Sequence, residues 1–449
     1  MKDKSLLIHN AVIVNEGQRF RGSVLIAGDK ISEVFHDETK PAVSANEEID
    51  ACGAYLIPGT IDCHVHFREP GLTAKADIGT ESAAAAAGGV TSYMDMPNCV
   101  PQTTTLEALE DKFKTAAEKS AVNYSFYFGA TNNNASLLAE LDKTRVCGVK
   151  VFMGASTGNM LVDRLDVLRK IFSSAGKLIA AHCEDQNVIR KNTESFRRQY
   201  GDDLDISLHP LIRSEEACWN SSSLAVSLAK ETGARLHVLH ISTARELSLF
   251  DNSLPLREKR ITAEACISHL MFCDEDYSRL GALIKCNPSV KTRADRDAIR
   301  KALASGVIDT IGTDHAPHLL TEKKGGALKA VSGLPSIQFS LVSIMELVSQ
   351  GILSMEQLVQ KMCHNPAILY GVKGRGYIRK GYQADLVLVN PDKEWTVTKD
   401  CILSKCGWSP FEGHTFTSKV ERTFVNGELV YDGHRVIPSV RGKELVFER

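Results

Sequence analysis

The chain has 449 residues, a formal net charge of -2 at pH 7 and a hydrophobic fraction of 43%. The balanced charge argues against a nucleic-acid or anionic-membrane surface, so we expect neither as a partner. The length exceeds one ordinary hydrophobic core and predicts a large domain of roughly 300 residues with a smaller one beside it.

The N-terminal stretch from Met1 to Asn15 contains only the short apolar run Leu6-Leu7-Ile8. That run is too short for a secretion signal or a membrane-spanning helix, so we expect a cytoplasmic protein. The twelve cysteines form no CxxC pair and several lie inside apolar runs, which predicts reduced, buried thiols instead of a disulfide framework.

Between about Pro58 and Gly351, short β-branched runs alternate with helical stretches, as in parallel βα units. Eight strands are predicted, the number that closes a (β/α)8 barrel. They lie at 61–67, 90–96, 124–130, 149–154, 178–183, 236–242, 261–267 and 310–315. The predicted helices lie at 80–87, 106–119, 136–143, 164–174, 215–231, 244–251, 294–304 and 336–349.

The two flanks of the chain differ from this middle part. Residues 5–55, 384–390 and 419–431 alternate apolar and polar side chains, and Asn426-Gly427 is typical of a tight hairpin. Neither flank is long enough for a sheet domain of its own. We therefore predict an α/β protein, a TIM-like barrel at 57–366 with a small β-sandwich formed by both chain termini, 1–56 and 367–449.

His64 and His66 are separated by one residue. On a strand, residues two apart point to the same face about 6.6 Å apart, so both imidazoles can converge on one metal or on two neighbouring metals. The same period places Asp62 and Arg68 on that face. The alternative is a pair of imidazoles on an exposed strand that bind only water.

In a barrel of this kind the active groups lie at the carboxyl ends of the strands. His182 lies at such a strand end, and its alternative role is that of a core histidine bonded to a carbonyl. We interpret His237 as structural, because it lies on the opposite face from His240. Neutral imidazoles and carboxylate-type oxygens suit zinc, with manganese or cobalt as alternatives. The candidate metal ligands at the strand ends are His64, His66, Lys150, His182, His240 and Asp314.

Lys150 lies within the apolar run from Gly148 to Met153. An uncompensated ammonium group is costly to bury there, so the side chain must be neutralised, paired or modified. Reaction of its neutral amine with CO2 gives a carbamate, which is an anionic bridge for two metal ions. The alternative is an unmodified lysine paired with an acid.

With these residues assembled, the chain resembles the cyclic amidohydrolases of the amidohydrolase superfamily, and among them the class I dihydroorotases. The resemblance covers nearly the whole length. It rests on His64-Val65-His66-Phe67-Arg68-Glu69-Pro70-Gly71, Gly88-Gly89-Val90-Thr91, Asp95-Met96-Pro97-Asn98, Lys150, His182-Cys183-Glu184-Asp185, His240-Ile241-Ser242, Lys285-Cys286-Asn287-Pro288, Asp314-His315-Ala316-Pro317-His318 and Pro410-Phe411-Glu412-Gly413. The chain departs from the common pattern at 267–270 and 332–336, which affects loop contacts and not the ligands.

The resemblance implies the same barrel and β-sandwich, and the reversible interconversion of (S)-dihydroorotate and N-carbamoyl-L-aspartate in de novo pyrimidine (UMP) biosynthesis. It implies two zinc ions, the first on His64, His66 and Asp314, the second on His182 and His240, with carboxylated Lys150 as the bridge. It also implies Asp314 as the catalytic base, Arg68, Asn98 and His318 as ligands of the substrate carboxylate, and Asn287 as a contact of the substrate ring.

Two other functions stay open at this point. One is another cyclic amidohydrolase, an allantoinase or a hydantoinase/dihydropyrimidinase, which shares the metal site but need not bind a substrate carboxylate. The other is a non-catalytic homologue that serves as a scaffold. We expect a small-molecule substrate and a homo-oligomer, a dimer, and leave docking with a transcarbamoylase open. Residues 319–331 are interpreted either as a lid or as a plain surface loop.

Overall fold

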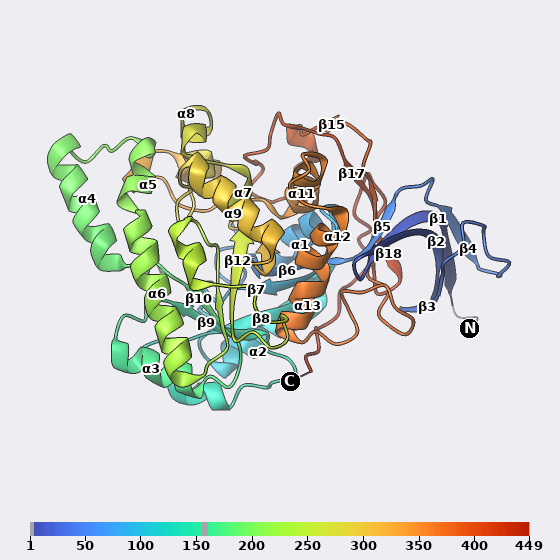
Figure 1. Cartoon of the computed structure of the whole chain (residues 1–449), viewed down its shortest axis with the longest axis horizontal. Coiled ribbons are helices and arrows are strands. Elements are labelled where there is room, and N and C mark those ends of the chain that lie inside the picture. The colour runs from blue at the N-terminus through green and yellow to red at the C-terminus, as the bar shows by residue number, and fades with distance from the viewer. Residues whose placement is uncertain (1–3, 155–159, 449) are drawn as a thin grey trace.

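The computed structural model describes residues 4–154 and 160–448. One of its two eight-stranded sheets consists of parallel strands that follow one another in sequence order (Figure 1). They are β6 (Thr60–Val65), β7 (Val90–Asp95), β8 (Asn123–Gly129), β9 (Gly148–Phe152), β10 (Ile179–His182), β11 (Leu236–Val238), β12 (Ile261–Cys266) and β13 (Thr310–Gly312). A parallel bridge between Val65 and His315 links the last strand region to the first. The predicted eight-stranded barrel is therefore confirmed.

The strands of the barrel are buried on both faces. Every residue of β6, β7, β8 and β9 is buried, because helices cover one face of the sheet and side chains fill the interior on the other. Polar residues of these strands, such as Asp62 and His64 in β6, are therefore buried together with the apolar ones.

Helices surround the barrel and connect its strands. They are α1 (Ile78–Ala87), α2 (Leu106–Lys119), α3 (Leu165–Ser174), α4 (Gln186–Tyr200), α5 (His209–Ile212), α6 (Glu215–Thr232), α7 (Ile267–Met271), α8 (Tyr277–Leu280), α9 (Arg293–Ser305), α10 (Gly326–Lys329), α11 (Ser340–Ser349), α12 (Met355–Val359) and α13 (Asn365–Tyr370). Several of these helices have an N-cap residue whose side chain accepts a hydrogen bond from the first turn. Asp77 caps α1 in this way, and Thr292 caps α9.

Two predicted helices are wrong. The segment at 136–143 forms only the short 3-10 turn Ala135–Ala139, and the segment at 244–251 forms the 3-10 turn Arg245–Leu249. In the second, the buried carboxylate of Glu246 accepts hydrogen bonds from the backbone and hydroxyl of Thr243. These bonds tie the segment to the loop that follows β11, and no regular helix continues from it.

Strands from both chain ends form a separate sheet in the order β18-β17-β14-β5-β1-β2-β3, with β4 also paired to β1. Their bounds are β1 (Ser5–Asn15), β2 (Gln18–Ala27), β3 (Lys30–Phe35), β4 (Glu47–Asp50), β5 (Tyr55–Pro58), β14 (Leu386–Asn390), β17 (Lys419–Val425) and β18 (Glu428–Tyr431). The antiparallel pair of β5 and β14 joins the two ends. A separate β domain from both termini is thus confirmed, and the boundaries 1–56, 57–366 and 367–449 stay a prediction.

The hairpin predicted at Asn426-Gly427 connects β17 to β18. Both residues have positive φ, 51° and 80°, the backbone that a two-residue type I′ turn requires. Between β14 and β17 the chain forms the small pair β15 (Trp395–Thr396) and β16 (Thr415–Phe416). From this stretch Trp408 Nε1 donates to His318 O at 2.7 Å, so the C-terminal part of the chain also supports the barrel.

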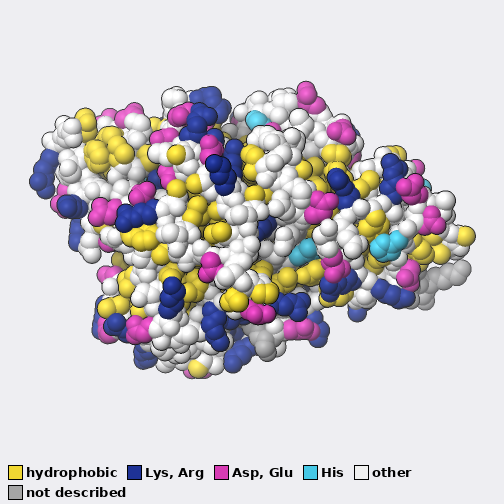
Figure 2. Space-filling model, in the orientation of Figure 1, with side chains coloured by type: hydrophobic (Ala, Val, Ile, Leu, Met, Phe, Trp, Pro, Cys, Tyr) yellow, Lys and Arg dark blue, Asp and Glu magenta, His cyan; other side chains and the backbone are white. Residues whose placement is uncertain are grey.

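The surface agrees with the balanced composition. In Figure 2 basic and acidic side chains are interspersed over the face that is drawn. No helix within residues 4–154 and 160–448 combines the length and the apolar character needed to span a bilayer. All twelve cysteines are free thiols, and nine of them are buried.

Candidate active site

A cavity of about 230 Å³ opens at the carboxyl ends of the barrel strands. All ten side chains that were predicted to form the site line this one cavity. They are His64, His66, Arg68, Asn98, Lys150, His182, His240, Asn287, Asp314 and His318. The structure therefore brings the whole predicted set together, and the role of each residue stays a prediction.

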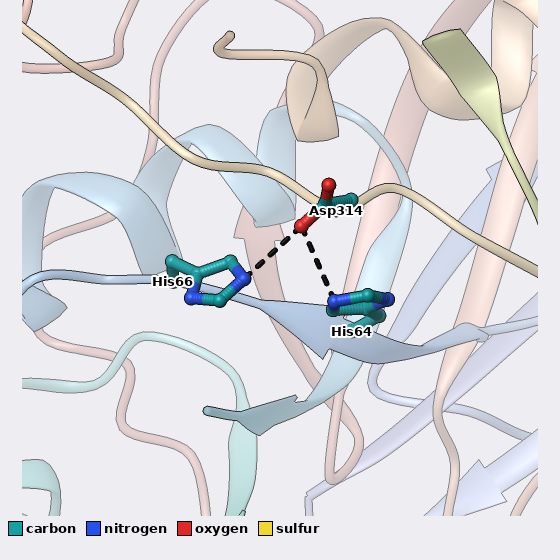
Figure 3. Close-up of side chains that lie close together, drawn as sticks. All are labelled: His64, His66 and Asp314. Carbon is teal, nitrogen blue, oxygen red and sulfur yellow. Dashed lines mark hydrogen bonds and ion pairs between the residues drawn. The ribbon is translucent and has the colours of Figure 1, made fainter. Parts of the chain in front are cut away.

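His64, His66 and Asp314 converge on one point (Figure 3). Nε2 of His64 lies 3.2 Å and Nε2 of His66 lies 3.0 Å from Oδ1 of Asp314. The other ring nitrogens are already used, because Nδ1 of His64 donates to Glu264 and Nδ1 of His66 donates to Asn98, both at 2.7 Å. If both rings are neutral, the lone pair of each Nε2 then faces a carboxylate oxygen. Two hydrogen-bond acceptors repel each other at this distance, and a bound cation would remove that repulsion.

The electrostatics of this group favour positive charge at the same point. Burial alone would lower the pKa of His64, but Glu264 and Asp314 outweigh burial and raise it to about 9. Burial alone would raise the pKa of Asp314, but His64 and His66 hold it well below its usual range. The carboxylates of Glu264 and Asp314 both contact His64, so a cation is stabilised in this part of the cavity.

His182 and His240 form a second convergent pair. Nδ1 of His182 lies 2.9 Å from Nε2 of His240, and Nε2 of His182 donates to Glu184 at 2.9 Å. Glu184 is buried and is itself paired with Arg213. No backbone carbonyl of the described residues takes a hydrogen bond from His182, so its geometry differs from that of an ordinary core histidine. Nδ1 of His240 is buried without a partner in the described part of the chain.

Lys150 is 1% exposed and its Nζ lies 4.6 Å from the centre of the Phe152 ring. No acid lies within ion-pair distance of it among residues 4–154 and 160–448. Burial lowers the pKa of Lys150 to about 8, so a neutral amine, the form that reacts with CO2, is accessible near neutral pH. The described residues offer no acid for the alternative of an unmodified lysine paired with one.

The two histidine groups adjoin each other, since the ring centres of His64 and His240 are 5.3 Å apart. Imidazole nitrogens, one carboxylate and a lysine that can become a carbamate are a donor set that suits divalent metals. The residues present therefore fit a metal centre, with one group at His64, His66 and Asp314 and another at His182 and His240.

Three site residues have backbone angles that side chains rarely adopt. Arg68, His240 and Asp314 have φ of 68°, 39° and 48°, and such left-handed conformations cluster at functional sites. β6 ends at Val65, so the predicted strand phase does not extend to Arg68. Arg68 reaches the cavity because the chain turns after the strand, not because it alternates along it.

Arg68 is 7% exposed and has no carboxylate partner among the described residues. Its Nε donates to Pro317 O at 3.0 Å and its Nη2 donates to Nε2 of His318 at 2.9 Å. Arg68 forms no salt bridge with the nearby acids Glu69 and Asp77, because Glu69 pairs with Lys119 and Asp77 pairs with Lys405. A buried guanidinium without an acid is unusual unless a ligand supplies the anion.

Sequence reasoning missed the carboxylates behind the histidines. Glu264 lies in β12, inside a predicted apolar strand, and it was not selected as a partner of His64. The available signal was an acidic residue inside an apolar run, because acids are rarely buried unless they are paired. Gly312 makes room for it, because a Cβ there would come within 2.5 Å of Glu264 Oε2. The structural role predicted for His237 agrees with its hydrogen bonds to Thr262 and Thr310.

Comparison with known proteins agrees with this geometry. The model of the Amidohydrolase family matches residues 55–430. The chain belongs to the amidohydrolase family. It is 33% identical over 436 residues to a dihydroorotase of Halobacterium salinarum (96% of this chain, 97% of that protein) and 31% identical over 444 residues to an allantoinase of Bacillus velezensis (96% and 95%).

Solved structures extend the comparison to a third activity. The L-hydantoinase (dihydropyrimidinase) from Arthrobacter aurescens superposes with a TM-score of 0.92 at 27% identity, over 99% of this chain and 100% of that one. These relatives are all cyclic amidohydrolases, so the predicted resemblance is confirmed at that level. The chain is therefore a hydrolase of a family whose members are generally metal-dependent, and candidate metal-binding residues lie together in the cavity.

Proposed function

We propose that this amidohydrolase is a dihydroorotase, which interconverts (S)-dihydroorotate and N-carbamoyl-L-aspartate in pyrimidine synthesis. The observation that carries the proposal is the buried Arg68 guanidinium in the wall of the metal-binding cavity, without an acid of its own. Dihydroorotate has a ring carboxylate that a planar guanidinium can bind. Allantoin and unsubstituted hydantoin lack a carboxylate and would leave this charge unpaired.

Two neighbours complete the proposed carboxylate site. His318 is held neutral, because burial and then the charges of Arg68 and Lys75 lower its pKa to about 2. Asn98 uses its Oδ1 to accept from His66, and its amide nitrogen has no partner in the described part of the chain. Arg68 and the Asn98 amide would therefore present donors to an anion at one side of the cavity, and the neutral His318 ring, whose nitrogens contact Arg68 and Lys75, would hold Arg68 in place.

Asn287 faces the same cavity from the loop after α8 and the 3-10 turn Gly281–Ile284. Its Oδ1 is buried and has no hydrogen-bond partner among the described residues. An unpaired buried acceptor costs free energy unless a ligand supplies a donor. The ring N–H groups of dihydroorotate are such donors, which supports the predicted contact between Asn287 and the substrate ring.

His64, His66, His182, His240, Asp314 and a carboxylated Lys150 would hold two zinc ions. When bound, such ions supply an activated water and polarise the ring amide carbonyl. Asp314 then acts as the base: its carboxylate takes the proton of the attacking water and delivers it to the ring nitrogen that leaves. In the condensing direction Asp314 removes the proton from that nitrogen and returns it to the departing hydroxyl.

The remaining alternatives make different demands on the site. Allantoinase and hydantoinase/dihydropyrimidinase, the activities named for two similar proteins, need no guanidinium for a substrate carboxylate. A non-catalytic scaffold would need none of the six predicted metal ligands, and all six line the cavity. A homodimer, docking with a transcarbamoylase and a cytoplasmic location stay predictions.

Ring opening of dihydroorotate, hydantoin and allantoin by the same preparation, with metal analysis, tests the proposal. We expect dihydroorotate to be the preferred substrate and the protein to contain about two zinc ions per chain if both predicted sites fill. Faster turnover of hydantoin or allantoin would overturn the dihydroorotase assignment and leave the broader cyclic amidohydrolase activity in place.

A further inference from the structure

Lys323 lies in the 3-10 turn Leu320–Lys323, inside the segment that was interpreted as a lid or a surface loop. Its side chain is not at the surface, since the residue is only 5% exposed. Nζ donates to three backbone carbonyls, those of Gly333 at 2.7 Å, Val331 at 2.8 Å and Lys285 at 3.2 Å. No carboxylate of residues 4–154 and 160–448 lies within ion-pair distance of it.

These three carbonyls belong to two separate segments of the cavity wall. Val331, Ser332 and Gly333 line the cavity directly, and Lys285 lies two residues before the lining residue Asn287. The segments also bond to each other, because Gly333 N donates to Lys285 O at 2.8 Å. One buried ammonium group therefore fastens both segments at the place where they meet.

The loop around Asn287 is held by buried donors on both sides. His209 Nε2 donates to Cys286 O and His269 Nε2 donates to Pro288 O, both at 2.9 Å. Lys323 donates to a third carbonyl of this loop, that of Lys285. Unlike His209 and His269, it also donates to segment 331–333. It couples the position of Asn287 to the position of the adjoining wall segment 331–333.

Gly333 shows how closely this segment approaches the proposed carboxylate site. Its φ is 132°, and a Cβ there would lie 2.6 Å from Ala316 O and 2.9 Å from Cδ2 of His318. A small shift of 331–333 would therefore move the wall beside His318. Small errors in position at such a wall have a large effect on how well a rigid ring is bound.

We propose that Lys323 is a positioning residue, which sets the spacing between Asn287 and segment 331–333 and so the shape of the pocket for the substrate ring. The identity of that ring rests on the proposed function; the positioning role does not. An ammonium buried without an acid is costly, and burial lowers the pKa of Lys323 to about 7. The three carbonyl contacts offset that cost and restrict the side chain to one place.

The substitution Lys323→Met shortens the unbranched side chain by one atom and removes the ammonium group with its three hydrogen bonds. We expect KM for dihydroorotate to rise by about ten-fold or more while kcat changes by less than about three-fold, because ring binding is altered and Asp314 is not. We also expect the Gly333 amide to exchange its hydrogen faster, since its acceptor Lys285 O is no longer fixed.

Lys361→Met is the matched control. Lys361 is 4% exposed and its Nζ donates to a backbone carbonyl, that of Ile308, at 2.6 Å. It does not line the cavity. This variant should lose stability without a change in KM or in Gly333 exchange.

An unchanged KM with unchanged Gly333 exchange in Lys323→Met would overturn the proposal. So would equal changes in both lysine variants, which would indicate a general loss of stability. If Lys323→Met does not fold, Lys323→Gln, which keeps an amide donor on a shorter side chain, is judged by the same two measurements. If the parent protein does not open dihydroorotate, the proposed function fails, and KM is measured with whichever of hydantoin or allantoin it hydrolyses.

Discussion

Oε1 of Glu264 accepts a hydrogen bond of 2.7 Å from Nδ1 of His64, with both side chains buried in the barrel. The bond fixes the ring so that Nε2 faces Asp314 and the cavity. Carboxylates in this position orient a metal-binding imidazole and raise its basicity. We therefore expect Glu264 to influence the candidate metal centre through His64.

Glu264→Gln should weaken metal binding by roughly 10- to 100-fold, the usual effect of losing such a partner. Titration with a chelator while bound metal is measured would show this. Glu246→Gln is the control, because Glu246 is also buried but bonds to Ser222 and Thr243 instead of a candidate ligand. Equal metal retention in the two variants would contradict the role of Glu264.

Arg68→Met should weaken dihydroorotate binding by about 1.5–3 kcal/mol, because it removes a charge-assisted pair with the substrate carboxylate. Metal content should stay the same. Any residual turnover of hydantoin should also be spared, since hydantoin has no carboxylate. Normal dihydroorotate binding by this variant would show that Arg68 has another purpose.

Asp314→Asn should reduce turnover by at least about 100-fold, the scale of losing a general acid–base group. Steady-state kinetics with metal analysis measure this. Asp309→Asn removes a comparably buried carboxylate that pairs with Lys259 at 2.8 Å outside the cavity. That control should lower stability and leave kcat nearly unchanged; a comparable kcat loss in both variants would argue against Asp314 as the base.

Lys150→Ala should lose at least one metal ion and nearly all activity, because two cations would then face each other without an anion between them. Acetate or propionate should restore part of both by occupying the space of the missing carbamate. Lys150→Arg should not respond, since a guanidinium stays cationic and forms no carbamate. Full activity with an unmodified Lys150, checked by intact mass, would rule out the bridged centre.

His269 makes a pH prediction for stability. Burial lowers its pKa to about 4 in the folded chain, below about 6.5 in an unfolded one. The unfolded chain then binds the extra proton between these values, so this contribution to stability is complete above pH 6.5 and is lost as the pH falls toward 4. The expected loss is about 1.4 kcal/mol per pH unit in that window.

Urea unfolding of the parent and of His269→Gln at pH 7.5, 6 and 5 measures this loss. The stability advantage of the parent should shrink as the pH falls, while effects of acid on the metal ligands are common to both proteins. An advantage that is constant with pH would mean that His269 does not titrate as its burial indicates.

The barrel could be predicted from the sequence, because its short strand segments differ clearly in residue pattern from the helical stretches between them. The sequence was insufficient for α4, where only Ile189 among fifteen residues is buried and the helical period of apolar residues is faint. The cavity residues were predictable because strand ends meet in a parallel barrel. Lys323 was not, since its three partners are backbone carbonyls, which leave no trace in the identity of a side chain.

The pairing of β5 with β14 has a consequence for how the chain is made. Tyr55–Pro58 leaves the ribosome more than 300 residues before Leu386–Asn390, the strand that covers its free edge. Until then β5 presents unpaired backbone groups, and such edges recruit other chains. The nascent protein therefore carries an aggregation-prone edge through the synthesis of its whole catalytic barrel, and conditions that slow elongation should increase the demand for chaperones.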